Sequence, residues 1–432
     1  MKAIFKHFSP ARVIVLGFAL TILLGSLLLS LPMSLRDGVK LNYIDALYTS
    51  TSAVCVTGLC AVDAGDTFSP IGQTVLALLI QVGGLGVTAV GAGVILAMGR
   101  KMNLKSRNVI REAMNLDSGK GVKRFLRDVF VTTLVFELIG AILSFPVFIQ
   151  RFPLPRAIGV SLFHSVAAFN NSGFDILGGG MNLIPYQDDL WLNLVTVALI
   201  FFGGIGFLVI REMGANGIHW KRYSMHAKVV LSVSAALTVV GTLLFRMTEE
   251  ITWLGAFFAS VTTRTAGFST FSFGEFTNAG LLVAMVLMFI GASPGSTAGG
   301  IKTSTFFVLL QGIKSAATNR SEKAFHYAIP KDAFRKAAVI LLLGLSVVLV
   351  ATLGLSILEP SLGFVDLLFE AVSAFGTAGL STGISAGLSV GSKLISILVM
   401  FIGRLGPLTI ATLWYFSRGE RVKYPDGDIA IG

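Results

Sequence analysis

Four short loops of the chain hold small residues and glycine where an enzyme would hold reactive side chains. They read SAVCVTGLC (52–60), AAFNNSGFD (167–175), SVTTRTAGFST (260–270) and SAFGTAGLST (373–382). Glycine tolerates positive φ angles, so it allows successive backbone carbonyls to turn toward one point. A ring of such carbonyl oxygens can replace the water shell of a monovalent cation. The chemistry that these loops predict is cation binding by the main chain.

Side-chain catalysis finds little support in the sequence. The five histidines form no HExxH motif, the carboxylates in apolar segments show no paired spacing, and no P-loop or Gly-x-Gly-x-x-Gly nucleotide fingerprint occurs. Glu137 is interpreted as a structural acid. Cys55 and Cys60 are too few for a disulfide framework or a metal site, and they are interpreted as small side chains. We therefore expect no enzyme and no cofactor.

The composition indicates that membrane-spanning helices position these loops. The chain is 54% hydrophobic and 13% charged, with a mean hydropathy of +0.79, whereas soluble domains carry about 25% charge. This balance predicts an integral membrane protein, and a spanning helix needs about 20 apolar residues. The predicted spans are Val13–Leu31, Ile71–Met98, Phe130–Ile149, Leu190–Ile210, Val229–Phe245, Leu281–Leu310, Ala337–Ile357 and Leu394–Ser417.

A shorter apolar segment precedes each glycine loop. At about 12 residues it cannot cross a bilayer and is predicted to be a re-entrant helix. The loop that follows would lie at membrane depth, where unpaired backbone groups are tolerated only in a protein interior or beside an aqueous path. The candidate re-entrant helices are Asn42–Val54, Ala157–Phe169, Thr252–Thr263 and Phe364–Phe375.

A second signature follows each loop, in the order QVGGLGV (81–87), FFGGIGF (201–207), FIGASPGST (289–297) and FIGRLGPLT (401–409). Two matched signatures, four times in the same order, predict four units of one architecture. The predicted fold is all-α integral membrane, with four span–pore helix–span repeats around a pseudo-fourfold pore. It has eight transmembrane helices and four re-entrant helices. The predicted repeats are residues 1–110, 111–220, 221–328 and 329–432.

The net charge of +11 is not distributed as in a nucleic-acid-binding protein. Lys and Arg gather at the N-terminus, in 99–128, 211–228 and 314–336, and after residue 417, and they are sparse in the intervening loops. This alternation predicts that both termini are cytoplasmic, in a multi-pass protein of the inner (plasma) membrane. The basic loops are expected to contact anionic lipid, not nucleic acid.

This repeated span–pore helix–span unit, with one glycine per loop, resembles the Ktr/Trk/HKT superfamily of potassium transporters over essentially the whole chain. It is most similar to the Ktr-type ion-translocating subunit. The resemblance implies potassium uptake with sodium as a candidate activator, a homodimer, and a cytosolic ring of nucleotide-binding regulatory subunits. In plant relatives a serine at the first filter position goes with sodium transport, so Gly58 indicates potassium. The potassium-binding filter residues that the resemblance implies are Val56, Thr57, Gly58, Asn171, Ser172, Gly173, Thr265, Ala266, Gly267, Thr377, Ala378 and Gly379.

A symmetric filter is not predicted in the second repeat, because Asn170 and Asn171 are bulkier and more polar than their counterparts. Arg264 lies in the third filter segment, where a cation facing the ion would oppose conduction. We expect it to point behind the loop and bind carbonyls or a carboxylate. Asp175 directly follows the second loop, and it is either a solvated loop acid or an attractant for cations at the outer mouth.

The second signature of the third repeat, GASPGSTAGGIKTST (291–305), departs from a regular helix. Proline removes a helical donor, so the residues alone predict a kink, whereas the resemblance implies a flexible intramembrane gate. Arg404 lies in an apolar span, where a charge is costly and usually functional. It would pair with loop carbonyls or Glu370, or brace the gate and oppose cation passage. The predicted gating residues are Gly291, Pro294, Gly295, Gly299, Gly300, Lys302 and Arg404.

Two other transport functions stay open at this point. One is a sodium-permeable member of the same superfamily. The other is a secondary transporter of another small solute, which would favour inverted repeats with broken helices around a midplane site. The repeats here run in one direction, and only the span of the third repeat carries a visible break.

Overall fold

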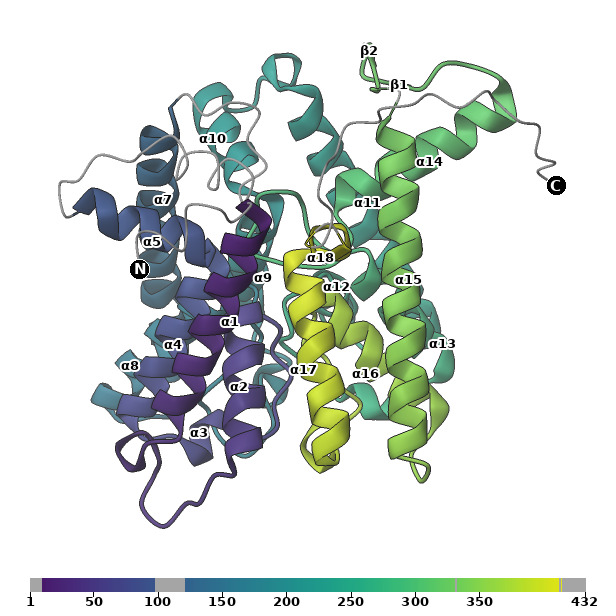
Figure 1. Ribbon diagram of the computed structural model, residues 1–432. Helices are drawn as coiled ribbons and strands as arrows, with labels where there is room; N and C mark the ends of the chain where they lie inside the picture. The colour runs from purple at the N-terminus through teal and green to yellow at the C-terminus, as the bar shows by residue number, and fades with distance from the viewer. Residues whose placement is uncertain (1–9, 98–120, 331, 412, 414–432) are drawn as a thin grey trace, which may run out of the picture.

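The protein folds into a bundle of helices with one short β-hairpin at one end (Figure 1). The structure is a computed structural model, and it describes residues 10–97, 121–330, 332–411 and 413. The hairpin pairs β1 (Lys323–Ala324) with β2 (Tyr327–Ala328) in antiparallel register. Short helical turns lie in the connections, at Pro32–Ser34, Ala64–Thr67 (α3), Ile184–Tyr186, Trp220–Arg222, Phe273–Glu275 and Ser385–Gly387.

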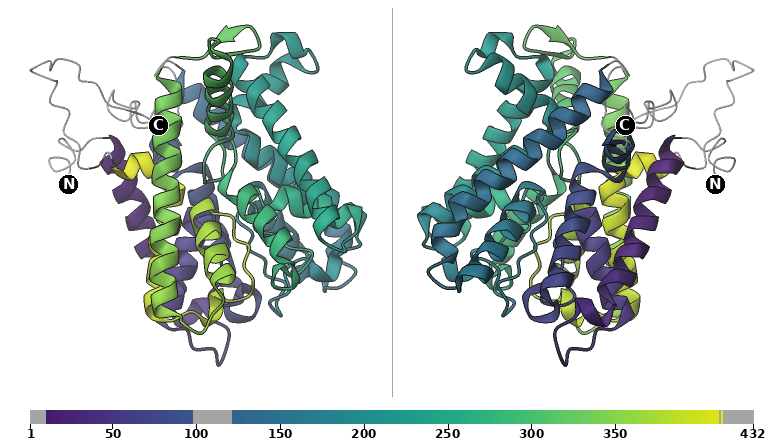
Figure 2. Two further views of the ribbon diagram at one scale, coloured as in Figure 1. Left: turned by 90° about the vertical axis from the view of Figure 1, so that its right-hand side faces the viewer. Right: turned by 90° about the vertical axis from the view of Figure 1, so that its left-hand side faces the viewer.

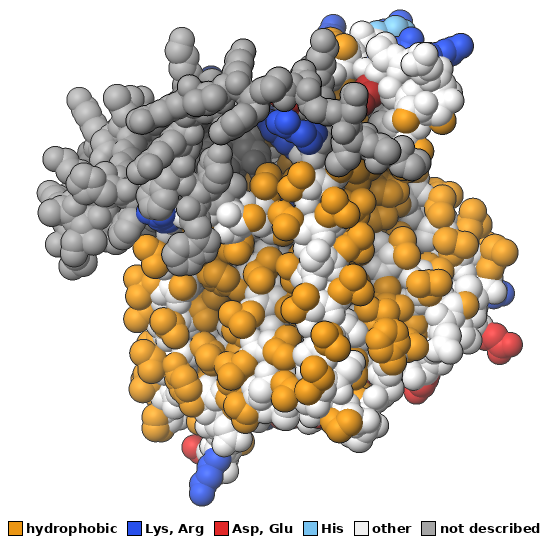
Figure 3. Space-filling model, turned by 45° about the vertical axis from the view of Figure 1, so that its right-hand side comes forward, with side chains coloured by type: hydrophobic (Ala, Val, Ile, Leu, Met, Phe, Trp, Pro, Cys, Tyr) orange, Lys and Arg blue, Asp and Glu red, His pale blue; other side chains and the backbone are white. Residues whose placement is uncertain are grey.

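Four long apolar helices open the four repeats. Their mean hydropathies run from 2.0 to 2.7, and only 28–33% of the most apolar window of each is buried inside the protein. The remaining leucine, isoleucine and valine side chains cover the outside in a broad apolar belt (Figure 3). Such a surface is stable against lipid and not against water. These helices are α1 (Pro10–Leu29), α7 (Val122–Phe148), α11 (Met225–Thr248) and α15 (Ala333–Leu358).

The four predicted re-entrant helices are present within a few residues of their expected bounds. Their C-terminal halves are almost wholly buried, and each packs against the long helix of its own repeat. In three repeats a serine hydroxyl of the short helix donates to a long-helix carbonyl: Ser50 to Ile22 at 2.7 Å, Ser165 to Glu137 at 2.6 Å and Ser260 to Thr238 at 2.8 Å. The short helices are α2 (Tyr43–Cys55), α8 (Leu154–Phe169), α12 (Trp253–Thr262) and α16 (Phe364–Gly376).

The second helix of each repeat ends earlier than predicted. The expected single spans Ile71–Met98 and Leu190–Ile210 are wrong, because each is a helix pair bent by 98° and 103° respectively. Gly86 and Gly206 sit at the bends with φ of +85° and +91°, and Gly406 breaks the last predicted span with φ of +86°. These backbone angles suit glycine and stop a right-handed helix. The pairs are α4 (Pro70–Leu85) with α5 (Val87–Ala97), α9 (Leu190–Ile205) with α10 (Phe207–Asn216), and α17 (Val390–Leu405) with α18 (Pro407–Ala411).

In the third repeat the break is longer, as the sequence predicted. Helix α13 (Asn278–Phe289) is followed by an irregular segment, and the helix resumes as α14 (Thr303–Thr318). By length and composition, four helices of the described residues can each cross a membrane, and two bent pairs pass the same test as single spans. At 12 and 16 residues, α13 and α17 are shorter than the roughly 20 residues of a helix that crosses a bilayer by itself. The ends of the predicted spans at residues 98 and 417, and the predicted repeat boundary at 110, lie outside the described residues.

The first and last repeats meet, so the four units form a closed ring. Helix α17 packs against α2, and Figures 1 and 2 show these two segments, yellow and purple, side by side. A buried ion pair joins them, with Lys393 Nζ 2.7 Å from Asp45 Oδ1. The four re-entrant helices therefore surround a common centre.

Candidate ion-conducting site

The four loop glycines meet at the centre of the ring. A Cβ built on Gly58 would lie 2.4 Å from the carbonyl oxygen of Ser172, and one on Gly379 would lie 2.1 Å from that of Thr57. Gly173 and Gly267 face the carbonyl oxygens of Ala266 and Ala378, each at 2.9 Å. Each glycine thus contacts the carbonyl that precedes the glycine of the next repeat, in the cyclic order 1, 2, 3, 4, 1. Only glycine leaves room for this approach.

The same backbone turn precedes every one of these glycines. The residue two positions earlier has a left-handed conformation, with φ of 56° at Val56, 56° at Asn171, 74° at Thr265 and 50° at Thr377. The glycine itself also has a positive φ, between +70° and +96°. A left-handed β-branched residue costs about 1–2 kcal/mol, so the surrounding packing must hold these turns in place.

The backbone turn of the second repeat, for which no symmetry was predicted, matches those of the first and fourth repeats. Ser172 N donates to Ala167 O at 2.9 Å, as Thr57 N does to Ser52 O at 2.7 Å and Ala378 N to Ser373 O at 2.9 Å. This is the hydrogen bond of a Schellman helix end. The third repeat differs from the other three. Its Ala266 N donates to Thr262 O, four residues earlier in the chain, whereas the other three bonds reach five residues back. The bulk of Asn170 and Asn171 is accommodated behind the turn, since both side chains are fully buried.

A cavity of about 440 Å³ opens on one side of the glycine ring. Gly58, Gly173, Gly267 and Gly379 all line it, together with Asp63, Asp175 and Cys60. The Cys60 thiol donates to the Gly58 carbonyl at 3.2 Å, and both cysteines are free, as their interpretation as small side chains requires.

Asp175 lies in the wall of this cavity, outside the membrane-spanning helices. It is partly buried, and its Oδ1 accepts from the Leu177 amide at 3.0 Å. Burial raises the pKa of Asp175 to about 7, and the nearby charges of Asp63 and Asp66 act in the same direction. The residue is therefore neither a freely solvated loop acid nor a permanently charged one.

The predicted gating segment lies on the other side of the ring. Gly299 packs on Thr377, whose Oγ1 would be 2.3 Å from a Cβ there, and Gly300 faces Gly376 O at 3.2 Å. Gly291 and Gly299 contact each other across the segment, which is thereby folded back on itself. The structure places the segment against the glycine turn of the fourth repeat.

Helix α9 anchors the other half of this segment. Ser293 N donates to Gly204 O at 3.0 Å, and Phe207 N donates to Gly295 O at 3.1 Å. The Pro294 carbonyl lies 2.6 Å from the Cβ position of Gly206 at the α9–α10 bend. The broken helix of repeat 2 supplies the free backbone groups that the irregular segment needs.

Arg404 binds the gating segment from helix α17. Its guanidinium donates to the carbonyl of Thr297 and to those of Gly83 and Gly84, the last at 3.2 Å. Glu370, the alternative partner, instead accepts from Ser381 at 2.8 Å and from Ser385. Lys302 Nζ donates to Ala298 O at 2.8 Å and Gly299 O at 3.2 Å. The two cations line a second cavity, of about 180 Å³.

The second-signature glycines have a role that the sequence did not reveal. A Cβ at Gly83, Gly203 or Gly403 would lie 2.1, 1.9 or 2.0 Å from the last-turn carbonyl of the pore helix of its own repeat. Those carbonyls belong to Val54, Phe169 and Phe375. A side chain at these positions would push the short helix, and with it the glycine turn that follows, out of place.

Arg264 points behind the third filter turn, as predicted, but its partner is neither a carbonyl nor a carboxylate. Its Nη2 donates to the Thr238 hydroxyl of α11 at 3.1 Å. A hydroxyl on a neighbouring helix leaves no periodic signal in the sequence, which is why this contact was missed.

A closed ring of four backbone turns, with a cavity on each side and an apolar outer belt, defines a multi-pass membrane protein of the pore-loop transporter class. Comparison with known proteins gives the family. The cation transport protein family TrkH matches residues 17–232 and 225–418.

Among its relatives, the potassium/sodium uptake protein NtpJ of Enterococcus hirae is 36% identical, over 100% of this chain and 99% of its own. The Ktr system potassium uptake protein B of Bacillus subtilis is 35% identical, over 99% and 97%. The solved potassium transporter TrkH of Vibrio parahaemolyticus shares the fold, with a TM-score of 0.74, 19% identity, and coverage of 95% of this chain and 87% of that one. The chain belongs to the Ktr/Trk-type family of potassium and sodium uptake transporters, and its activity is transport, not catalysis.

Proposed function

We propose that the protein takes up potassium through a selectivity filter made of backbone carbonyls. The observation that carries this proposal is the closed contact order of the four loop glycines, each set against the carbonyl that precedes the next one. The ligands would be the carbonyls of Val56–Gly58, 171–173, 265–267 and 377–379. Sodium would act as an activator. The pore-helix C-termini, which end at these turns, add a negative potential near the ion.

A sodium-permeable transporter is the second candidate, because the name of the Enterococcus hirae relative includes both ions. Purified full-length protein in liposomes, given radiotracer rubidium or sodium at equal concentration, separates the two. The proposal expects rubidium uptake that exceeds sodium uptake and that potassium competes away. Equal uptake of both ions would favour the second candidate, and uptake of neither would overturn both.

The segment between α13 and α14 would be the gate of this pathway. It crosses directly beneath the filter turn of repeat 4, and Arg404 and Lys302 hold its carbonyls. Two fixed cations beside the pathway oppose the passage of a third. Opening would require Arg404 to release the Thr297 carbonyl.

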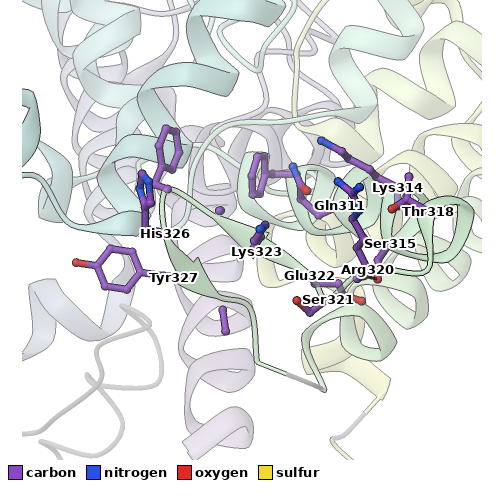
Figure 4. A pocket seen from close by; sticks show the side chains of 14 residues that line it. Gln311, Lys314, Ser315, Thr318, Arg320, Ser321, Glu322, Lys323, His326 and Tyr327 are labelled. Atoms are coloured by element: carbon purple, nitrogen blue, oxygen red, sulfur yellow. Dashed lines mark hydrogen bonds between the residues drawn. The ribbon is translucent and has the colours of Figure 1, made fainter.

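A cytosolic regulatory ring of nucleotide-binding subunits would act on this gate through α14, which begins immediately after it. A cavity of about 780 Å³ separates the end of α14 from the β-hairpin (Figure 4). Lys314, Arg320 and Lys323 line it, so it would accept an acidic segment of the partner. Lys314→Glu is expected to abolish activation by the regulator and to leave the basal uptake unchanged, and retained activation would refute this docking site.

We further propose that the transporter is a homodimer in the plasma membrane with both termini in the cytoplasm. The alternation of basic and non-basic loops supports this orientation. A tag at either terminus should be digested by protease in inside-out vesicles and protected in right-side-out vesicles.

A further inference from the structure

The four residues that lie three positions before the filter glycines differ in chemistry. Three of them end the pore helix or directly follow it, and Arg264 lies two residues beyond the end of α12. Repeats 1 and 4 place Cys55 and Gly376 there, and repeat 2 places Asn170. Repeat 3 places Arg264, so one charge stands behind one of four filter turns.

The neutral counterpart in repeat 2 has several partners for its amide nitrogen, although its Oδ1 has none. Asn170 Nδ2 donates to Gln81 Oε1 at 2.9 Å and to Glu137 Oε1 at 3.0 Å. This network ties the second filter turn to α4 and α7. It shows what a polar side chain at this position does when its role is to hold the turn in place.

Arg264 has no such set of partners. It is 8% exposed, its Nε has no hydrogen-bond partner, and its Nη2 donates to the Thr238 hydroxyl at 3.1 Å. Within the residues that the structure describes, no carboxylate lies within ion-pair distance of its guanidinium. A cavity of about 10 Å³ beside it, lined by Ser234, Gly204 and Ala292 among others, holds at most one water.

A buried guanidinium without a counter-charge destabilises the fold, because the free-energy cost of its desolvation is not recovered. An arginine also stays charged under these conditions. Its effect must therefore be sought in what the charge does to its surroundings. The nearest functional surroundings are the carbonyls of 265–267, which follow it directly in the chain.

We propose that Arg264 is a fixed positive charge behind the filter that weakens the binding of any monovalent cation and so speeds its release. The inference rests on the proposed function of the filter. For an assumed separation of about 10 Å and an effective dielectric constant of about 20, a unit charge changes the dissociation constant roughly tenfold. Removal of the charge tightens binding and slows turnover.

A purely positioning role predicts a different result. If Arg264 only held the turn in place through Thr238, its loss would alter the carbonyl geometry and hence the ratio of potassium to sodium affinity. A remote charge acts on both ions by the same factor and leaves that ratio unchanged. Thr238→Val removes the hydroxyl partner and keeps the charge, so it separates the two roles without altering Arg264.

The test measures potassium and sodium dissociation constants by calorimetry on the full-length protein in detergent. Arg264→Gln is the first neutral variant, and Arg264→Asn is the second, because the equivalent position of repeat 2 accommodates an asparagine. Arg264→Lys keeps the charge. Both neutral variants should lower the two dissociation constants roughly tenfold with an unchanged ratio, while Arg264→Lys and Thr238→Val should bind as the wild type does.

A changed ion ratio in the neutral variants, or in Thr238→Val, would assign Arg264 to positioning and overturn the inference. Unaltered dissociation constants in the neutral variants would overturn it as well. If the wild-type protein bound neither ion, the proposed filter itself would fail. The two failures are therefore distinguishable within one series of measurements.

Discussion

Two glycines four residues apart in the last loop give a sharp test of the ring. Gly379 and Gly383 both have positive φ, +81° and +99°. A Cβ at Gly379 would lie 2.1 Å from Thr57 O, whereas a Cβ at Gly383 would have no atom within 4 Å. We expect Gly379→Ala to abolish cation uptake and Gly383→Ala to preserve it.

The expected magnitudes follow from this geometry. Both alanines pay about 1–2 kcal/mol for a left-handed conformation, so that contribution cancels in the comparison. At Gly379 the contact must open from 2.1 Å to at least 3.0 Å, and overpacking of this kind costs about 1–3 kcal/mol more. The displacement also exceeds the tolerance of about 0.5 Å for a preorganised binding site.

Growth of a potassium-uptake-deficient bacterium on low potassium, and radiotracer rubidium uptake in liposomes, provide the measurements. Protein level and the midpoint of thermal unfolding in detergent are recorded for both variants. Loss of uptake in Gly379→Ala alone, with both proteins folded, agrees with the ring. Equal uptake in the two variants would refute the reasoning that the glycine contact shapes the conducting site.

Three further predictions concern charged groups. Arg404→Ala leaves the gating carbonyls without a donor and is expected to raise rubidium uptake several-fold while it lowers the unfolding midpoint; unchanged uptake would contradict the barrier. Asp45→Asn should cost about 3–5 kcal/mol because it strands a buried Lys393, and a double replacement by apolar residues should recover most of that loss in a denaturation assay. Burial raises the pKa of Asp175 to about 7, so stability declines as pH rises from about 4 to about 7, where only the unfolded chain readily loses this proton. At low potassium, uptake should rise as pH passes through about 7, where the folded protein loses this proton and the vestibule becomes negative, and Asp175→Asn should remove both pH effects.

The sequence predicted the parts of the site that depend on local chemistry. The short apolar segments ahead of the glycine loops are too short to cross a membrane, and their bounds agree with α2, α8, α12 and α16 within a few residues. The broken third repeat was predicted because Pro294 cannot continue a helix. Glycine and proline act on their own backbone, so their effects can be inferred without knowledge of the fold.

The sequence did not predict features that depend on contacts between segments far apart in the chain. The bends at Gly86 and Gly206 were missed because the apolar pattern continues through them. Hydropathy indicates that a segment lies in lipid, but it does not indicate where the helix axis changes direction. The pair of Asp45 with Lys393 joins residues 348 positions apart. Arg264 was placed correctly on the far side of the loop, but its hydroxyl partner depends on how α11 packs.

The departures from fourfold symmetry are concentrated in the third repeat, and this bears on how the transporter opens. Its pore helix, α12, has 10 residues against 13 to 16 in the others, and its filter turn has a different end bond. It carries the charge behind the filter and the irregular segment below it. The other three repeats keep the Schellman turn, and in each of them a second-signature glycine (Gly83, Gly203 or Gly403) contacts the pore helix. If the transporter opens at the proposed gate, the third repeat, with its shorter pore helix, its charge without a counter-ion and its broken span, is the unit expected to move.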